Sequence, residues 1–474
     1  MSSGLSFADS SVWGILVMFA VIFGGLLLGN TAKRFIPFLR KSLIPVSVIG
    51  GLILLFVSTI VKLITGEYLF NLPGLNESFK MSGIEMLEVL TYHCLAIGFI
   101  AMTLRKSKKS AKGTGRFGEV INTGIMTVST YLVQAFTGLL VTIAASYAVN
   151  KLIKASGLIL CFGFGQGTGQ ALNYGSIYEN DYGFIGGKSF GLTIAALGFL
   201  AASIGGVIYL NIHKKKGDII IREAKSELNN EIVEEEGEVP MVDSIDKFTI
   251  QIAIVIICYF LTFLVMFGLG ELVGDGLKTT IYGFNFLFGA LSAILVKSIL
   301  GLLRKSGLMK RDYLNNFLLN RIAGFAFDIM IVAGIGAIQI DLIIDYWWVL
   351  LILAVVGVAG TYFYCHFVAF KLFPNYANEQ FMVMYGMLTG TASTGVILLR
   401  EIDPQFETPA SENIVYQNFP AILLGFPMMI VAAFCPKQES YVYITLGILA
   451  AYFIVLNLIL FRSVIFKKKK KEQK

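Results

Sequence analysis

Charge is scarce in this chain: charged residues make up 15% of its 474 residues, whereas 56% are hydrophobic and the mean hydropathy is +0.74. A water-soluble protein of this length could not bury so much apolar surface, so lipid must be the solvent for most of it. Apolar runs of about 19 to 25 residues recur, the length that crosses roughly 30 Å of hydrocarbon. The sequence therefore predicts an all-α polytopic membrane protein.

Residue types that carry enzyme chemistry or hold metal ions are also few. The three histidines and five cysteines have no metal-ligand spacing, and the cysteines lie in apolar stretches as small core residues do. No Gly-Lys-Ser/Thr follows the glycine-rich stretch "CFGFGQGTGQALNYG" at 161–175, which excludes a phosphate loop. We expect neither an enzyme nor a cofactor. The net charge of +7 does not indicate nucleic acid, because the basic residues cluster beside apolar segments.

Six apolar segments precede a charged stretch at 213–247, and seven follow it. They cover residues 12–30, 43–64, 83–104, 119–149, 157–178 and 190–211, then 248–270, 281–303, 317–340, 346–370, 376–399, 413–435 and 440–461. The charged stretch contains "HKKKGD" and "EEEGEVP" and is too polar to bury. We expect it to be a solvated cytoplasmic linker.

Clusters of basic residues predict the topology, because such clusters stay on the cytoplasmic side. They lie at 32–41, 105–116, 213–216, 304–311 and 467–471. Three apolar segments separate the second cluster from the third, and five separate the fourth from the fifth, although an even number must cross in each interval. One segment in each interval must therefore enter and leave on the same side. With this topology, we expect the N-terminus outside the cell and the C-terminus in the cytoplasm. We expect the protein to lie in the inner (plasma) membrane.

The segments that fail to cross are expected to be 157–178 and 376–399, which are rich in glycine. Each glycine costs about 1 kcal/mol relative to alanine in a helix. The two segments share a pattern with a separation of 223 residues: Gly163-x-x-x-Gly167-Thr168 matches Gly386-x-x-x-Gly390-Thr391. Such a pattern can be a helix-packing face, but two matched copies at the weak segments favour broken helices instead.

In the predicted topology, the first half of the chain begins on the outer side of the membrane and the second half begins on the inner side. The two halves are therefore expected to be inverted repeats. We expect the first repeat at 1–212, the linker at 213–247, the second repeat at 248–436, and an extra transmembrane helix with a basic tail at 437–474. Each repeat contains one re-entrant hairpin. This arrangement is typical of a secondary transporter, in which broken helices offer positive N-termini to a carboxylate and carbonyl oxygens to a cation.

Candidate substrate-binding residues are the glycines and polar side chains of the two hairpins: Gly165, Gln166, Gly167, Thr168, Gly169, Asn173, Gly386, Thr389, Gly390, Thr391, Ser393 and Thr394. Candidate ion-coupling residues are Asp328, Thr168, Thr391 and Ser393, because hydroxyl and carboxylate oxygens suit Na⁺. An ionised aspartate in a membrane segment costs at least roughly 2.5–3.5 kcal/mol, so we expect Asp328 to face the protein interior. The sequence leaves the full set of sodium ligands open.

The chain resembles the bacterial sodium:glutamate symporter family over about residues 40–435. The resemblance is carried by "SLIPVSVIGGLILL" (42–55), "LAIGFIAMTLR" (95–105), "GQGTGQA" (165–171) and "GTASTG" (390–395). It implies a homodimer of ten-helix protomers, each with two inverted five-helix repeats, in which a transport domain moves against a dimer scaffold and couples Na⁺ to L-glutamate. The hairpin motifs of the family match Gly165, Gly167, Thr168, Gly169, Gly390 and Thr394.

Some residues depart from the family pattern. Gln166 stands where the glutamate carriers have histidine, Ser393 where they have proline, and Asp328 where they have an apolar residue. The helix at 440–461 is an addition. We therefore expect sodium-coupled symport of glutamate or a related small carboxylate by alternating access. Two alternatives stay open: a proton-coupled or exchange carrier for another organic anion, with Asp328 titrating, and a channel whose selectivity filter is built from the hairpins.

Overall fold

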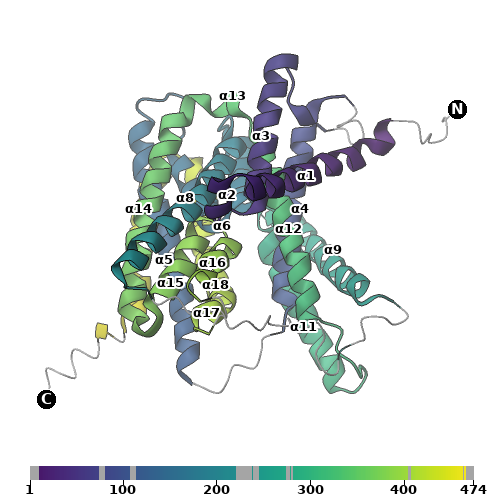
Figure 1. Cartoon of the computed structure of the whole chain (residues 1–474), viewed down its shortest axis with the longest axis vertical. Coiled ribbons are helices and arrows are strands. Elements are labelled where there is room, and N and C mark those ends of the chain that lie inside the picture. The colour runs from purple at the N-terminus through teal and green to yellow at the C-terminus, as the bar shows by residue number, and fades with distance from the viewer. Residues whose placement is uncertain are drawn as a thin grey trace.

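The computed structural model of the chain describes residues 10–73, 81–106, 114–219, 238, 245–273, 278, 281–403, 407–462 and 464–465, and these are almost entirely helical (Figure 1). The helices of the first half are α1 (Ser10–Phe35), α2 (Pro37–Lys41), α3 (Val46–Thr65), α4 (Gly83–Leu104), α5 (Thr114–Ala145), α6 (Ile159–Gln166), α7 (Thr168–Tyr182) and α8 (Gly187–Lys216). Those of the second half are α9 (Lys247–Val273), α11 (Asn285–Lys305), α12 (Asn316–Gly336), α13 (Ile340–Ile343), α14 (Trp347–Leu372), α15 (Ala377–Thr389), α16 (Ala392–Arg400), α17 (Ala410–Tyr416), α18 (Asn418–Phe434) and α19 (Glu439–Leu460).

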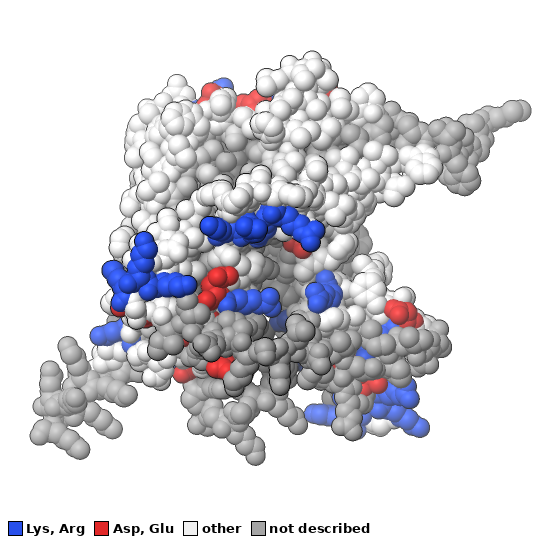
Figure 2. Space-filling model, in the orientation of Figure 1, with Lys and Arg blue, Asp and Glu red and all other residues white. Residues whose placement is uncertain are grey.

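Eleven helices in the described part of the chain are long and apolar enough to cross a membrane. Every apolar segment expected from the sequence contains one of them, except 157–178 and 376–399. The prediction of an all-α polytopic membrane protein is confirmed. On the face drawn in Figure 2, Lys and Arg gather from the middle downward, and the area above them is largely uncharged, as expected where side chains face hydrocarbon.

The helices form two lobes, and neither lobe is made from one half of the chain (Figure 1). In the first lobe, α4 packs against α11 and α12, α12 against α3, α3 against α1, and α11 against α9. In the second lobe, which comprises α5–α8 and α14–α19, α5 packs against α14, α18 and α19, and α8 packs against α6, α7 and α15. Helix α7 lies at the boundary, because it also contacts α4 and α12 of the first lobe.

The two glycine-rich segments are each broken into a pair of helices that contact each other. The segment 157–178 becomes α6 and α7, and 376–399 becomes α15 and α16. In the second pair, a Cβ atom at Gly386 would lie 2.8 Å from the Cα of Gly395, so the backbones of α15 and α16 approach closely only because both residues are glycine. The chain therefore folds back on itself at residues 390–391.

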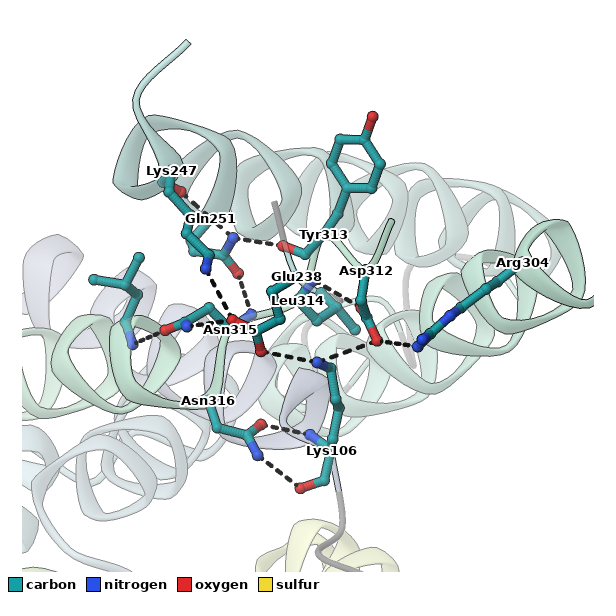
Figure 3. A network of polar contacts seen from close by, with 11 residues as sticks. Lys106, Glu238, Lys247, Gln251, Arg304, Asp312, Tyr313, Leu314, Asn315 and Asn316 are labelled. Atoms are coloured by element: carbon teal, nitrogen blue, oxygen red, sulfur yellow. Dashed lines mark hydrogen bonds and ion pairs between the residues drawn. The ribbon is translucent and has the colours of Figure 1, made fainter. Parts of the chain in front are cut away.

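A network of polar contacts holds one residue of the charged linker against the first lobe (Figure 3). The carboxylate of Glu238 accepts from Lys247 Nζ at 2.8 Å, from Lys106 Nζ at 3.0 Å and from Asn315 Nδ2 at 2.7 Å. Lys106 also pairs with Asp312, between α11 and α12, at 3.1 Å. The network therefore joins the end of α4, the start of α9 and the start of α12.

The expectation of a wholly solvated linker is wrong at Glu238, whose side chain is 1% exposed. A lone carboxylate could not be buried in this way, but two ammonium groups and an amide offset the desolvation. Burial raises the pKa of Glu238, yet the hydrogen bonds from Lys247, Asn315 and Lys106 outweigh it and hold the pKa below its usual range. Composition could not reveal this, because Lys106 is 132 residues away in the sequence.

Candidate functional site

A cavity of about 420 Å³ lies between the two lobes. Helices α4 and α12 of the first lobe line one side of it, and the two helix breaks line another, together with α16, α17 and α18. Gly165 and Gln166 from the first break and Gly390 and Thr391 from the second are among the lining residues. Residues selected from two distant stretches of sequence therefore share one cavity.

The first break depends on a single glycine. Helix α6 ends at Gln166, α7 begins at Thr168, and Gly167 between them has φ 82° and ψ −171°. Residues with a Cβ atom are essentially excluded from this region of backbone conformation. The short interruption therefore leaves the last carbonyl groups of α6 and the first N–H groups of α7 at the break without intrahelical partners.

The second break is capped by a side chain. Thr391 is the N-cap of α16, and its Oγ1 accepts a hydrogen bond from the backbone N–H of Thr394 at 3.4 Å. The hydroxyl oxygens of the same two residues lie 3.3 Å apart. Thr394 is fully buried behind Thr391, which is half-buried at the cavity.

The two breaks meet each other. A Cβ atom at Gly167 would lie 3.5 Å from Thr391 Cγ2 and 4.0 Å from the carbonyl oxygen of Gly390. Helices α7 and α16 therefore both begin at the place where the breaks touch. Because a helix N-terminus carries about half a positive elementary charge, this place favours an anionic group.

Two residues of α5, which we did not select from the sequence, bind the exposed backbone at both breaks. Tyr131 Oη donates to the carbonyl of Gly165 at 3.2 Å, and Gln134 Nε2 donates to the carbonyl of Leu388 at 2.8 Å. The two residues are three positions apart and so share one face of the helix. The signal was a glutamine in the middle of the apolar run "STYLVQAF".

The start of α7 is packed against the first lobe. Thr168 Oγ1 lies 3.5 Å from the carbonyl oxygen of Met330 in α12, and a Cβ atom at Gly334 would lie 3.0 Å from Thr168 Cβ. A Cβ atom at Gly169 would lie 2.7 Å from Leu95 of α4. Thr168 and Gly169 therefore mediate contact between the lobes and do not line the cavity.

Other selected residues make different contacts. Asn173 Nδ2 donates to the carbonyl of Gly283 at 2.9 Å, and Thr389 Oγ1 donates to the carbonyl of Tyr385 in its own helix at 2.6 Å. Gly386 serves the packing of α15 on α16. The side chain of Ser393 lies outside the described part of the structure.

Asp328 is not in the interior of the chain, so that expectation is wrong. It is exposed on α12 and lies beside Ser47 at the start of α3, whereas its neighbours Phe327 and Met330 line the cavity. Because residues 327 and 328 are about 100° apart around the helix axis, one can face the cavity while the next does not. The sequence predicted that Asp328 lies near the middle of its helix, but it did not show which face of the helix carries the side chain.

The cavity wall is mainly apolar, and its polar groups are mostly uncharged. Gln166 Nε2 is buried and has no hydrogen-bond partner among the described residues. Neither polar atom of the Gln170 side chain, in the first turn of α7, has a partner within that part of the chain. The exceptions are Arg105 and Arg400, which also line the cavity; Arg105 donates to Asn320 Oδ1.

Groups of three or more His, Cys, Asp or Glu side chains that could hold a metal ion do not occur among the described residues. No protein-family model matches the chain, and no curated protein matches it.

Proposed function

We propose that the protein is a secondary active transporter that couples Na⁺ to the uptake of glutamate or a related small carboxylate by alternating access. The observation that carries the proposal is the meeting of two broken helices at one cavity, where Gly167 lies against Thr391. Interrupted helices are tolerated at membrane depth where they are buried in protein or line a cavity. Transporters place substrate and coupling ion at such interruptions.

The chemistry of the cavity suits a small carboxylate. The N-terminus of α16 provides backbone N–H groups at the cavity, the nearby N-terminus of α7 adds positive potential, and the amide of Gln166 provides a further donor. The cavity volume lies within the range of about 300 to 1,000 Å³ that is typical of small-molecule sites. Apolar walls would strengthen each of these polar interactions by excluding water.

The packing of the helices supports inverted repeats. Helix α4 packs against α12 and α5 against α14, and these pairs occupy equivalent places in the two halves of the chain. Gly98 of α4 and Gly334 of α12 both lie at close helix contacts. Two similar halves that cross the membrane in opposite directions can exchange conformations, and this exchange would open the cavity to each side in turn.

The cavity runs along one face of α4. Leu95, Phe99, Met102 and Arg105 line it, so it extends for about 15 Å along the helix axis toward the basic end of α4. The positive-inside rule assigns this end to the cytoplasm. The structure would then be an inward-facing state, with Arg105 on the route by which an anion leaves.

The experiment is uptake of labelled glutamate into proteoliposomes that contain the purified protein, with an inward Na⁺ gradient and a matched K⁺ control. Accumulation above the external concentration that disappears when the Na⁺ gradient is dissipated would support the proposal. Equilibration without accumulation would indicate a channel instead. Accumulation driven by a proton gradient, and lost in Asp328→Asn, would favour the proton-coupled alternative.

A further inference from the structure

We infer that Gln134 of α5 supplies a ligand to the coupling cation, at a site behind the first helix break. The inference rests on the sodium coupling proposed above. Gln134 is fully buried, and it lies where the C-terminal ends of α6 and α15 both approach α5. A buried amide in a membrane helix is costly unless both its nitrogen and its oxygen are bound.

The hydrogen bonds of Gln134 fix the direction of its amide group. Nε2 donates to the carbonyl of Leu388 at 2.8 Å and to Thr361 Oγ1 at 2.7 Å. Because a backbone carbonyl can only accept, the nitrogen must face Leu388, and Oε1 must point away from it. Oε1 has no hydrogen-bond partner among the described residues. An unpaired buried oxygen of this kind costs about 1–3 kcal/mol, so the position calls for a bound partner.

The unpaired oxygen faces the last turn of α6. A Cβ atom at Gly165 would lie 3.2 Å from Gln134 Oε1, and Gly165 itself lines the cavity. The amide oxygen of Gln134 therefore lies beside the backbone of a residue that lines the cavity. Tyr131 is the other neighbour, because the same Cβ atom would lie 2.3 Å from its Cε1.

The electrostatics at this position favour a cation. Gly165 is in the last turn of α6 and Leu388 in the last turn of α15, so two helix C-termini converge on Gln134. Each C-terminus carries about half a negative elementary charge, and together they balance one monovalent cation. The N-termini of α7 and α16 lie on the other side of the two breaks, where their positive potential favours a carboxylate beside the cation.

The available donor atoms suit a hard cation such as Na⁺. They are the amide oxygen of Gln134 and the backbone carbonyl oxygens that end α6, including Gly165, whose carbonyl also accepts from Tyr131 Oη. Neutral oxygen donors of this type bind hard cations, whereas transition metals prefer imidazole and thiolate.

The test measures thermal unfolding of the purified full-length protein in NaCl and in choline chloride at equal ionic strength, without substrate. In the wild type, Na⁺ should raise the unfolding midpoint. Gln134→Leu should need about 10- to 100-fold more Na⁺ for the same effect, the usual range when support of a metal site is lost. Thr361→Val is the matched control, because it removes a hydrogen bond to the same amide but keeps Oε1.

A purely structural role for Gln134 would give a different result. Gln134→Leu would then respond to Na⁺ as the wild type does, or Thr361→Val would lose the response equally, and either outcome overturns the inference. If Gln134→Leu does not fold, Gln134→Glu keeps an oxygen there, and its Na⁺ response should weaken as the pH falls. A response independent of pH would contradict the site.

Failure of this inference can be told apart from failure of the transport proposal. A wild type that shows no Na⁺ response in unfolding and no Na⁺-driven uptake overturns both. A wild type that accumulates glutamate with Na⁺, beside a Gln134→Leu variant with unchanged Na⁺ dependence, overturns only the role of Gln134.

Discussion

The aromatic rings of Phe162 and Tyr174 stack face to face across the first helix break, with their centroids 3.5 Å apart and their planes within 5° of parallel. Phe162 belongs to α6 and Tyr174 to α7, and both side chains are buried. Tyr174 Oη also donates to the carbonyl of Met429 in α18 at 2.8 Å. The stack therefore joins the two helices on either side of Gly167, and the hydrogen bond of Tyr174 connects them to α18.

Removal of this stack should destabilise the protein. Phe162→Ala leaves a cavity in a packed interior, and we expect a loss of about 3–5 kcal/mol in the free energy of unfolding. Thermal unfolding of the purified protein in detergent measures it. Phe363→Ala is the control, because Phe363 is 70% exposed on α14 and its loss should shift the free energy by no more than about 0.5 kcal/mol. Equal shifts in the two variants would contradict the role of the stack.

The backbone conformation of Gly167 gives a second prediction. An alanine has room there, since its Cβ would make only an ordinary contact with Thr391, but it cannot adopt φ 82° and ψ −171° without strain. Gly167→Ala should cost about 1–3 kcal/mol and should reduce uptake, because relief of the strain moves the break. Gly447→Ala in α19 meets open space and should be neutral or slightly stabilising. An active, stable Gly167→Ala protein would refute the need for this conformation.

The hydroxyl group of Thr391 can be tested apart from its size. Thr391→Val loses the N-cap of α16, at a cost of about 1 kcal/mol, and should also weaken the Na⁺ dependence of uptake. Thr391→Ser keeps the oxygen and should keep the dependence. Thr389→Val is the control, because that hydroxyl bonds to its own helix. Unchanged Na⁺ activation in Thr391→Val would remove this hydroxyl from the ion site.

Much of the fold follows from the sequence in a direct way. The apolar lengths predict the spanning helices, the positions of the basic clusters predict one segment in each half that does not span, and glycine content selects 157–178 and 376–399 as those segments. Glycine content then predicts the breaks, because a single residue such as Gly167 carries the required backbone conformation. These are local properties, which is why one sequence suffices to find them.

The site was predictable only in part, because its remaining members depend on tertiary contacts. The local sequence gives Tyr131 and Gln134 no role that distinguishes them from other residues of a long helix. Their role follows only from the fold, which brings the ends of α6 and α15 next to them. In the opposite sense, Asn173 looks like a binding residue but bonds to the backbone at Gly283. Helical periodicity alone could not decide whether Asp328 points inward or outward.

The buried carboxylate of Glu238 gives a fourth prediction. Glu238→Gln removes the negative charge that pairs with the ammonium group of Lys247, whose side chain is 1% exposed, and we expect a loss of about 3–5 kcal/mol. Glu271→Gln is the control, because the Glu271–Lys278 pair is exposed and contributes about 0–1 kcal/mol. Thermal unfolding at neutral pH compares the two.

The pH dependence of the same comparison has a definite sign. The pKa of Glu238 is lowered in the folded protein, so its contribution is complete above the unfolded value of about 4.3 and disappears as the pH falls through the folded value. The difference between wild type and Glu238→Gln should therefore shrink in acid. A difference that grows as the pH falls would show that another group is responsible.

In the proposed transport cycle, the ion pair between Lys106 and Glu238 would also limit how far the two lobes can move relative to each other. Lys106 begins the connection from α4 to α5, and Glu238 lies in the connection from α8 to α9. These two connecting segments between the lobes are therefore attached to the first lobe at the same place. The shorter of these connecting segments runs from Lys106 to Thr114 and can span at most about 29 Å when fully extended. If the second lobe moves relative to the first as proposed, its displacement must fit within that length, and shortening this connection should stop transport while leaving the cavity intact.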